Sequence, residues 1–145
     1  KEEEASGKIV DVGRRRDAFS GRTIRVLVAE DNELNMEIVR TILGEAGIST
    51  EGAFNGQEAL NAFQASGDGY YQAILMDLQM PVMDGFEAMR RIRAFDPAVP
   101  IVAVTAFAYD RDRQKAFAAG ANGYVAKPLS GEHIRRVLGT LLAEI

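Results

Sequence analysis

The sequence predicts an α/β fold in which one five-stranded parallel sheet lies between helices on both of its faces. From residue 23 onward, five short apolar runs alternate with five longer stretches of helical periodicity, and turn-forming residues separate them. Right-handed crossover connections place the helices of such a chain on the two faces of the sheet. With 145 residues, 47% of them hydrophobic and 26% charged, the chain has the composition of one ordinary globular domain.

The first strand is predicted at 24–29 and the first helix at 35–46. Apolar residues recur in this helix at four-residue steps: Ile38, Ile42 and Ala46. Gly47 ends the helix, as glycine commonly does just beyond a last helical turn.

The second strand is weaker and is predicted at 48–53. Asn55-Gly56 leads from it into a helix at about 57–65, whose Leu60 and Phe63 are expected to point inward. The Ser-Gly-Asp-Gly sequence that follows is typical of a loop.

The third strand is a compact apolar run at 73–76, and a helix at about 86–94 follows it after a turn. The fourth strand, 101–104, is rich in β-branched residues and precedes a helix at 110–119. A brief fifth strand is predicted at 124–126. Apolar residues at helical spacing predict a last, amphipathic helix: Ile134, Val137, Leu138, Leu141, Leu142 and Ile145.

Residues 1–22 do not follow this alternation. They mix charged and small residues, including three glutamates at 2–4 and three arginines at 14–16, which is typical of a solvated linker or tail. We therefore predict a tail over 1–22 and one domain over 23–145. Because the first residue is Lys and not Met, we expect the chain to be a piece of a longer protein.

Composition excludes several classes of function. The formal net charge of -4 argues against direct binding to nucleic acid. Without cysteine, the chain has no thiolate metal site and no catalytic thiol, and its single histidine, His133, excludes multi-histidine metal sites. The longest apolar run, 101–108, is too short to span a membrane, so we expect no membrane contact.

Side chains that can bind ions or take part in reactions follow four of the five strands: Glu30 and Asp31, Asp77, Thr105, and Lys127. One such residue usually caps the next helix, but Asp77 is separated from its helix by Pro81 and Gly85, and capping would have to explain four strand ends together. The carboxyl ends of parallel strands meet at one edge, where ligands bind. We therefore expect these groups to form one site.

Three carboxylates at one edge repel one another unless a cation is present. Oxygen ligands without histidine or cysteine suit Mg²⁺, which in turn binds phosphate oxygens. A carboxylate can attack phosphorus when a metal, a lysine and a hydroxyl group neutralise the developing charge, and the sequence offers one of each.

These residues resemble the receiver domain of two-component response regulators over 23–145. The resemblance is carried by the acidic pair Glu30-Asp31, by Asp77 in the sequence LMDLQMPVMDG, by Thr105-Ala106 and by Tyr124 three residues before Lys127-Pro128. It implies a flavodoxin-like receiver fold with strand order 2-1-3-4-5.

The resemblance also implies a role for each residue of the acid set. Asp77 would be the phosphoacceptor, and Mg²⁺ would be bound by Asp77, by Asp31, by Glu30 through a water, and by the backbone carbonyl of Gln79. Lys127 would pair with a phosphoryl oxygen, and its bond to Pro128 would be cis.

The switch of this family maps onto two residues. Thr105 would bond the phosphoryl group, and Tyr124 would turn inward behind it, which changes the surface of the fourth helix, fifth strand and fifth helix. A Tyr124 that simply packs at the sheet edge fits the same composition. Gln79 and Phe107 occupy the positions that tune phosphate lifetime, and Phe107 predicts slow to intermediate self-dephosphorylation because it would shield the phosphoryl group.

As a receiver, the domain would take its phosphoryl group from a histidine kinase or a histidine phosphotransfer domain in the cytoplasm. It would catalyse its own phosphorylation and dephosphorylation, without further turnover. The resemblance favours the C-terminal receiver of a hybrid sensor histidine kinase over a stand-alone regulator. The sequence leaves open whether phosphorylation promotes dimerisation.

Other functions remain as alternatives. A pseudo-receiver could serve only as a protein-binding scaffold. A magnesium-dependent phosphatase with an aspartate nucleophile is disfavoured, because Gln79 stands where it would need a second aspartate as general acid. A flavodoxin-like cofactor binder is disfavoured because Glu30-Asp31 would repel a phosphate after the first strand.

Overall fold

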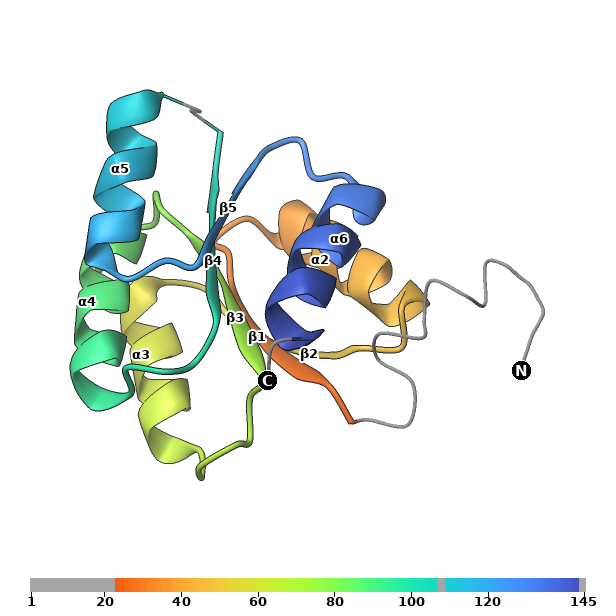
Figure 1. Cartoon of the computed structure of the whole chain (residues 1–145), viewed down its shortest axis with the longest axis horizontal. Helices are drawn as coiled ribbons and strands as arrows, with labels where there is room; N and C mark the ends of the chain where they lie inside the picture. The colour runs from red at the N-terminus through yellow and green to blue at the C-terminus, as the bar shows by residue number, and fades with distance from the viewer. Residues whose placement is uncertain (1–22, 107–108, 144–145) are drawn as a thin grey trace.

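The structure is a computed structural model that describes residues 23–106 and 109–143 (Figure 1). The predicted tail and Phe107 lie outside the described residues. Within the described part of the chain, no helix combines the length and apolar character needed to cross a bilayer.

Five parallel strands form one sheet in the order β2-β1-β3-β4-β5, which confirms the predicted fold. The strands are β1 (Arg25–Ala29), β2 (Ser49–Ala53), β3 (Ala73–Asp77), β4 (Ile101–Thr105) and β5 (Gly123–Ala126). The helices are α2 (Glu33–Glu45), α3 (Gly56–Ala65), α4 (Gly85–Phe95), α5 (Asp110–Ala119) and α6 (Gly131–Ala143). Each predicted element is present, with ends that differ by a few residues.

The sheet separates two apolar cores, because successive strand residues point to opposite faces. In β1, Leu27 and Ala29 pack with α3, α4 and α5, whereas Val26 and Val28 pack with α2 and α6. Figure 1 shows the same division of the helices into two layers. Strands that are buried on both faces explain why the sequence shows continuous apolar runs rather than alternation.

The inward face of α2 agrees only in part with the repeat seen in the sequence, because Ala46 is buried and Ile42 packs against the core but Ile38 does not. The side chains that α2 buries are Met36, Val39 and Leu43, while Ile38 is 42% exposed. Both sets have helical spacing, so periodicity alone predicts the helix but not its rotation about its axis. Contact with the sheet decides that rotation.

Side-chain caps begin three of the helices at the carboxyl edge of the sheet. Asn32, Asn55 and Asp84 accept hydrogen bonds from backbone N–H groups in the first turns of α2, α3 and α4, at 2.8 to 2.9 Å. These caps explain why polar residues follow β1, β2 and the loop after β3, and they leave Asp77 outside the capping pattern.

Candidate functional site

Asp77 is the last residue of β3, the central strand of the sheet, and it is 4% exposed. Its Oδ2 accepts a hydrogen bond from Lys127 Nζ at 2.9 Å, and its Oδ1 accepts one from the backbone N–H of Gln79 at 3.0 Å. Both oxygens of this buried carboxylate are therefore oriented, one by the adjoining loop and the other by a lysine from a distant part of the chain.

Glu30 and Asp31 reach the same place from the end of β1. Glu30 is buried, with Oε1 3.0 Å from Lys127 Nζ and Oε2 accepting from the backbone N–H of Asn32 at 3.1 Å. Asp31 is exposed. One carboxylate oxygen from each of Glu30, Asp31 and Asp77 lies within 4.8 Å of the other two. We call these three residues the acid cluster.

The acid cluster fits a hard divalent cation. Three converging carboxylates supply only oxygen ligands and an excess of negative charge, which is the chemistry that Mg²⁺ prefers. Asp31 lies on the open side of the cluster, while Glu30 and Asp77 lie buried beneath it. This arrangement could bind a cation that keeps some of its own water.

Lys127 follows β5 and brings a positive charge to the two buried carboxylates. The Lys127–Pro128 bond is cis, as the sequence resemblance implied. Burial lowers the pKa of Lys127, but the hydrogen bonds to Asp77 and Glu30 outweigh it, so the net pKa is raised. The ammonium group therefore stays protonated beside the cluster.

The loop after Asp77 is held against the sheet by glycine. The N–H of Gly85 donates to the carbonyl of Leu78 at 3.1 Å, and a Cβ atom at Gly85 would lie 2.2 Å from the carbonyl oxygen of Asp77. A turn before this helix was predicted from the sequence, but the close approach at Gly85 was not. A glycine directly after a capping aspartate was the available signal.

Gln79 is exposed within this loop, next to the cluster. Its N–H contacts Asp77, while its side chain faces solvent. Gln79 therefore lies beside the acid cluster.

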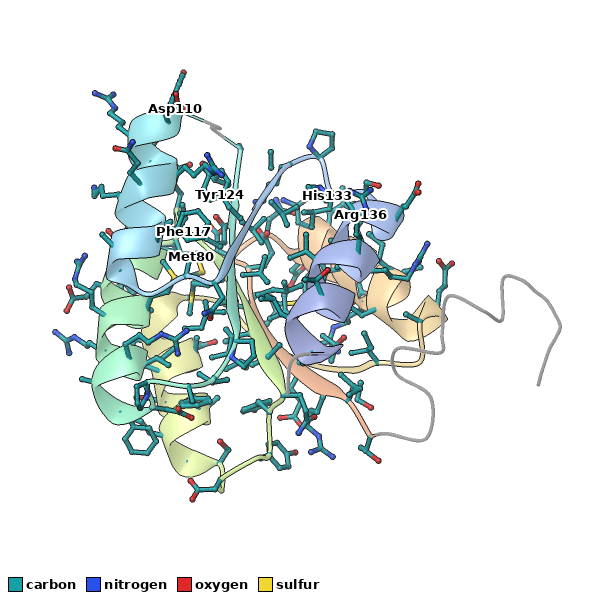
Figure 2. All side chains as sticks on the ribbon, in the orientation of Figure 1. Met80, Asp110, Phe117, Tyr124, His133 and Arg136 are labelled. Carbon is teal, nitrogen blue, oxygen red and sulfur yellow. The ribbon has the colours of Figure 1, made fainter. Side chains whose placement is uncertain are left out.

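Thr105 and Tyr124 lie on the neighbouring strands β4 and β5. Thr105 ends β4 with 2% exposure, and its carbonyl accepts a hydrogen bond from the backbone N–H of Lys127 at 2.8 Å. Tyr124, in β5, is half-buried and lies beside Phe117 of α5, with ring centroids 6.5 Å apart (Figure 2). Burial, followed by the negative charge of Asp112, raises the pKa of Tyr124.

The predicted site residues that the structure describes therefore meet at one edge of the sheet. Three carboxylates and an ammonium group converge from the ends of β1, β3 and β5, and the backbone of Lys127 is bonded to Thr105 at the end of β4. The arrangement can bind a cation, orient an anion against a lysine, and present a carboxylate oxygen as a nucleophile.

Comparison with known proteins places this geometry in one family. The family model described as "Response regulator receiver domain" matches residues 26–138. The chain is 41% identical over 125 residues to the rice two-component response regulator ORR41, covering 85% of this chain and 94% of that protein.

Hybrid kinases are also similar to this chain. It is 34% identical to hybrid signal transduction histidine kinase L of Dictyostelium discoideum over 119 residues, and the aligned region covers 79% of this chain. The chain spans only 7% of the length of that kinase, and likewise 7% of hybrid signal transduction histidine kinase I.

Solved structures agree with the sequence comparisons. The receiver domain of the sensor histidine kinase PA1611 from Pseudomonas aeruginosa, solved with a magnesium ion in its active-site cleft, is 34% identical, with a TM-score of 0.76 over 83% of this chain and 98% of that one. The receiver domain of yeast Ssk1, solved with the histidine phosphotransfer protein Ypd1, is 35% identical, with a TM-score of 0.75 over 83% and 92%. The chain belongs to the response regulator receiver domain family of two-component signalling.

Proposed function

We propose that this domain accepts a phosphoryl group from a phosphohistidine onto Asp77, with Mg²⁺ bound at the acid cluster. The observation that carries the proposal is the buried Asp77 carboxylate, held 2.9 Å from Lys127 Nζ among two further carboxylates. An Asp77 oxygen forms a bond to phosphorus as the phosphorus–nitrogen bond breaks, and the electron pair of that bond returns to the imidazole ring.

Each residue around Asp77 has a role in this proposal. Glu30, Asp31, Asp77 and the carbonyl of Gln79 would hold Mg²⁺, which supplies positive charge against the phosphoryl oxygens. Lys127 neutralises a further oxygen from the position it already occupies beside Asp77. Mg²⁺ and Lys127 would thus place positive charge where negative charge develops on the phosphoryl oxygens.

Thr105 and Tyr124 are proposed as the switch. The Thr105 hydroxyl bonds the phosphoryl group, and Tyr124 then moves into the space behind it, away from its present position beside Phe117. The changed surface comprises α5, β5 and α6, which are the fourth helix, fifth strand and fifth helix of the sequence prediction. Phosphorylation acts as a shift between two packings of this surface.

The lifetime of the phosphoryl group is proposed to depend on Gln79 and Phe107. The exposed Gln79 side chain can orient a water for attack on phosphorus. Phe107, outside the described residues, offers no polar group, so slow to intermediate self-dephosphorylation stays our prediction.

The proposed donor is a histidine kinase or a histidine phosphotransfer domain, and the proposed parent is a hybrid histidine kinase. The similarity to kinases L and I of Dictyostelium discoideum supports this parent, as does the yeast Ssk1 receiver domain solved with Ypd1 for the donor. The similarity to ORR41 along 94% of its length keeps a stand-alone regulator as the alternative.

An exposed apolar surface on α2 is the proposed docking surface for this donor. Leu34 is 69% exposed and Ile38 is 42% exposed, and Ile38 shares a small cavity with Lys127, Pro128 and Leu129. Lys127 lines this cavity and also contacts Asp77, so a phosphohistidine that approaches Asp77 would pass Leu34 and Ile38. The protein that carries the phosphohistidine could then cover these apolar side chains.

We expect Leu34→Ser to slow transfer from a phosphohistidine donor about threefold to tenfold, because the substitution removes apolar contact area. Phosphorylation by acetyl phosphate would be unchanged, since a small donor needs no docking surface. Phe95→Ser is the control, because it removes a 55% exposed apolar side chain at the end of α4, and it should leave both reactions unchanged.

The experiment that tests the phosphoacceptor is the intact mass after incubation with acetyl phosphate, with and without Mg²⁺. We expect one added phosphoryl group that needs Mg²⁺ and is abolished by Asp77→Asn. Asp84→Asn is the matched control, because it makes the same change nearby and asparagine can still cap α4. An adduct that persists in Asp77→Asn would contradict the proposal.

The alternatives give different results in the same experiment. A protein-binding scaffold would gain no phosphoryl group and would not bind beryllofluoride. A phosphatase would release phosphate continuously without a stable adduct.

A further inference from the structure

A second candidate site lies at the opposite end of the sheet from the acid cluster. The loop before β3 and the loop before β4 enclose a cavity of about 370 Å³. This volume lies within the range of small-ligand sites, although at its lower end. Both loops precede their strands, so the cavity and Asp77 are at opposite ends of β3.

Aromatic side chains form the apolar part of this cavity. Phe63 and Tyr71 are buried and stacked, with ring centroids 6.3 Å apart, and the ring of Phe95 meets Phe63 edge-on at 6.0 Å. Phe95 remains 55% exposed at the end of α4. A large aromatic ring is thus held beside the cavity without being covered by the rest of the described chain.

The charged side chains that line the cavity are both acidic, namely Asp68 and Asp96. Asp96 Oδ1 accepts hydrogen bonds from the backbone N–H groups of Ala98 and Val99, at 2.7 and 3.2 Å. These bonds orient the carboxylate and leave Oδ2 available. Asp68 is exposed on the facing loop.

Two arginines lie near the cavity, and burial lowers the pKa of one of them, Arg93, while the charge of Asp96 raises it by a smaller amount. Arg93 donates to the carbonyls of Gly120 and Asp96 and to the side chain of Asn122, at 2.6 to 3.2 Å, and it does not line the cavity. Arg25 lies over the ring of Tyr70, 4.0 Å from its centroid, and 3.8 Å from Glu51.

The contacts of Arg25 show how this fold holds a guanidinium group. Its planar cation lies over the ring of Tyr70 and donates to the Tyr70 carbonyl at 2.9 Å, with the carboxylate of Glu51 3.8 Å from Nε. The cavity offers the same two features, aromatic rings and a carboxylate with a free oxygen, but with no cation of the chain among its lining residues.

We propose that the cavity formed by Phe63, Tyr71, Phe95, Asp68 and Asp96 binds a guanidinium group, such as the side chain of an arginine. The group stacks on the aromatic wall and donates to Asp68 and Asp96. The cavity shares no residue with the acid cluster.

Titration of the ¹⁵N-labelled chain with ethylguanidinium tests this proposal, with ethylurea as the neutral probe of similar shape. We expect ethylguanidinium to shift the amide signals of Gly67 and Gly69, which line the cavity, with a dissociation constant on the order of millimolar. Ethylurea should shift them much less. The affinity should fall as salt is added.

Variants identify the groups that bind. Asp68→Asn should weaken ethylguanidinium binding at least about threefold, as should Phe95→Ala. Asp110→Asn is the matched control, since it removes the same charge at the far end of the molecule, at the start of α5 (Figure 2). Equal shifts with ethylurea, no shift at Gly67 and Gly69, or unchanged affinity in both cavity variants would overturn the proposal.

Two sources of arginine can be separated. A peptide with one arginine tests a partner protein, and replacement of the arginines at 14–16 by glutamine tests the chain itself. If the replacement alone shifts the Gly67 and Gly69 signals and strengthens ethylguanidinium binding, the site binds the chain's own arginines. If it changes neither, and the peptide competes with ethylguanidinium, the arginine comes from a partner.

Discussion

The acid cluster and the tyrosine cluster, the latter formed by Arg25, Glu51, Tyr70 and Tyr71, hold carboxylates in different ways. In the acid cluster, two buried carboxylates share one ammonium group, with a third carboxylate beside them. In the tyrosine cluster, the half-exposed Glu51 accepts hydrogen bonds from both tyrosine hydroxyls, and Arg25 lies 3.8 Å away. The comparison suggests that excess buried negative charge marks a binding site, whereas a carboxylate satisfied by neutral donors stabilises the scaffold.

The loops at the two ends of β3 also differ. At the acid cluster, a Cβ atom at Gly85 would collide with the carbonyl oxygen of Asp77, whereas a Cβ atom at Gly67, before β3, would have no neighbour within 4 Å. The carboxyl end therefore depends on close backbone packing, and the amino end leaves space.

The largest expected effect comes from Gly85→Ala. We expect a loss of about 4 kcal/mol or more in the free energy of unfolding, because the new methyl group must displace backbone. Gly67→Ala should change it by less than about 0.5 kcal/mol. Urea denaturation of both variants measures the contrast, and equal losses would show that the two loops do not differ in packing.

Replacing the positively charged residue of each cluster by methionine should lower the free energy of unfolding by different amounts. Lys127→Met should lower the free energy of unfolding by about 2 to 3 kcal/mol, since it leaves the carboxylates of Glu30 and Asp77 buried without a positive charge beside them. Arg25→Met should lower it by about 1 kcal/mol or less, because Arg25 and Glu51 are partly solvated.

Added Mg²⁺ tests whether a second cation can replace the charge of Lys127. Added Mg²⁺ should raise the urea midpoint of Lys127→Met more than that of the unsubstituted chain, because it would replace the missing charge at the acid cluster. It should leave Arg25→Met no more responsive than the unsubstituted chain. A response to Mg²⁺ that Lys127→Met does not enlarge would contradict this role of the ammonium group.

The smallest expected effect is the pH dependence of the tyrosine cluster. Hydrogen bonds from Tyr70 and Tyr71 lower the pKa of Glu51 from its ordinary value of 4.5, against the opposing effect of burial. A lowered pKa stabilises the fold above the ordinary value, and that stabilisation is lost as the pH falls through the folded value. Between about pH 6 and about pH 3, the unsubstituted chain should therefore lose slightly more stability than Glu51→Gln. Urea midpoints at both pH values measure this difference, and identical losses would contradict it.

Much of the fold and site could be predicted because both depend on simple periodicities. Apolar runs separated by helical stretches require a parallel sheet with covered faces, so residues directly after the strands, such as Asp77 and Lys127, must meet at one edge. The chemistry of carboxylates and lysine then narrows what that edge can bind. The roles of Thr105, Tyr124 and Gln79 remain predictions, since position next to Asp77 does not establish a reaction.

Other features depend on contacts that periodicity does not encode. In α2, packing on the sheet buries Met36, Val39 and Leu43 and leaves Ile38, which the periodicity placed inward, 42% exposed. The close approach of Gly85 to Asp77 depends on the path of the whole loop.

The sequence by itself determined the α/β class, the number of strands, and the acidic and basic groups at their carboxyl ends, because local periodicity and strand direction are sufficient for these. Only the tertiary structure decided which face of α2 is buried, that Glu51 meets two tyrosines, and that Phe63, Phe95 and Asp68 surround one cavity. These residues come from separate elements, so their meeting depends on helix rotation and loop path, which are set when the whole core packs.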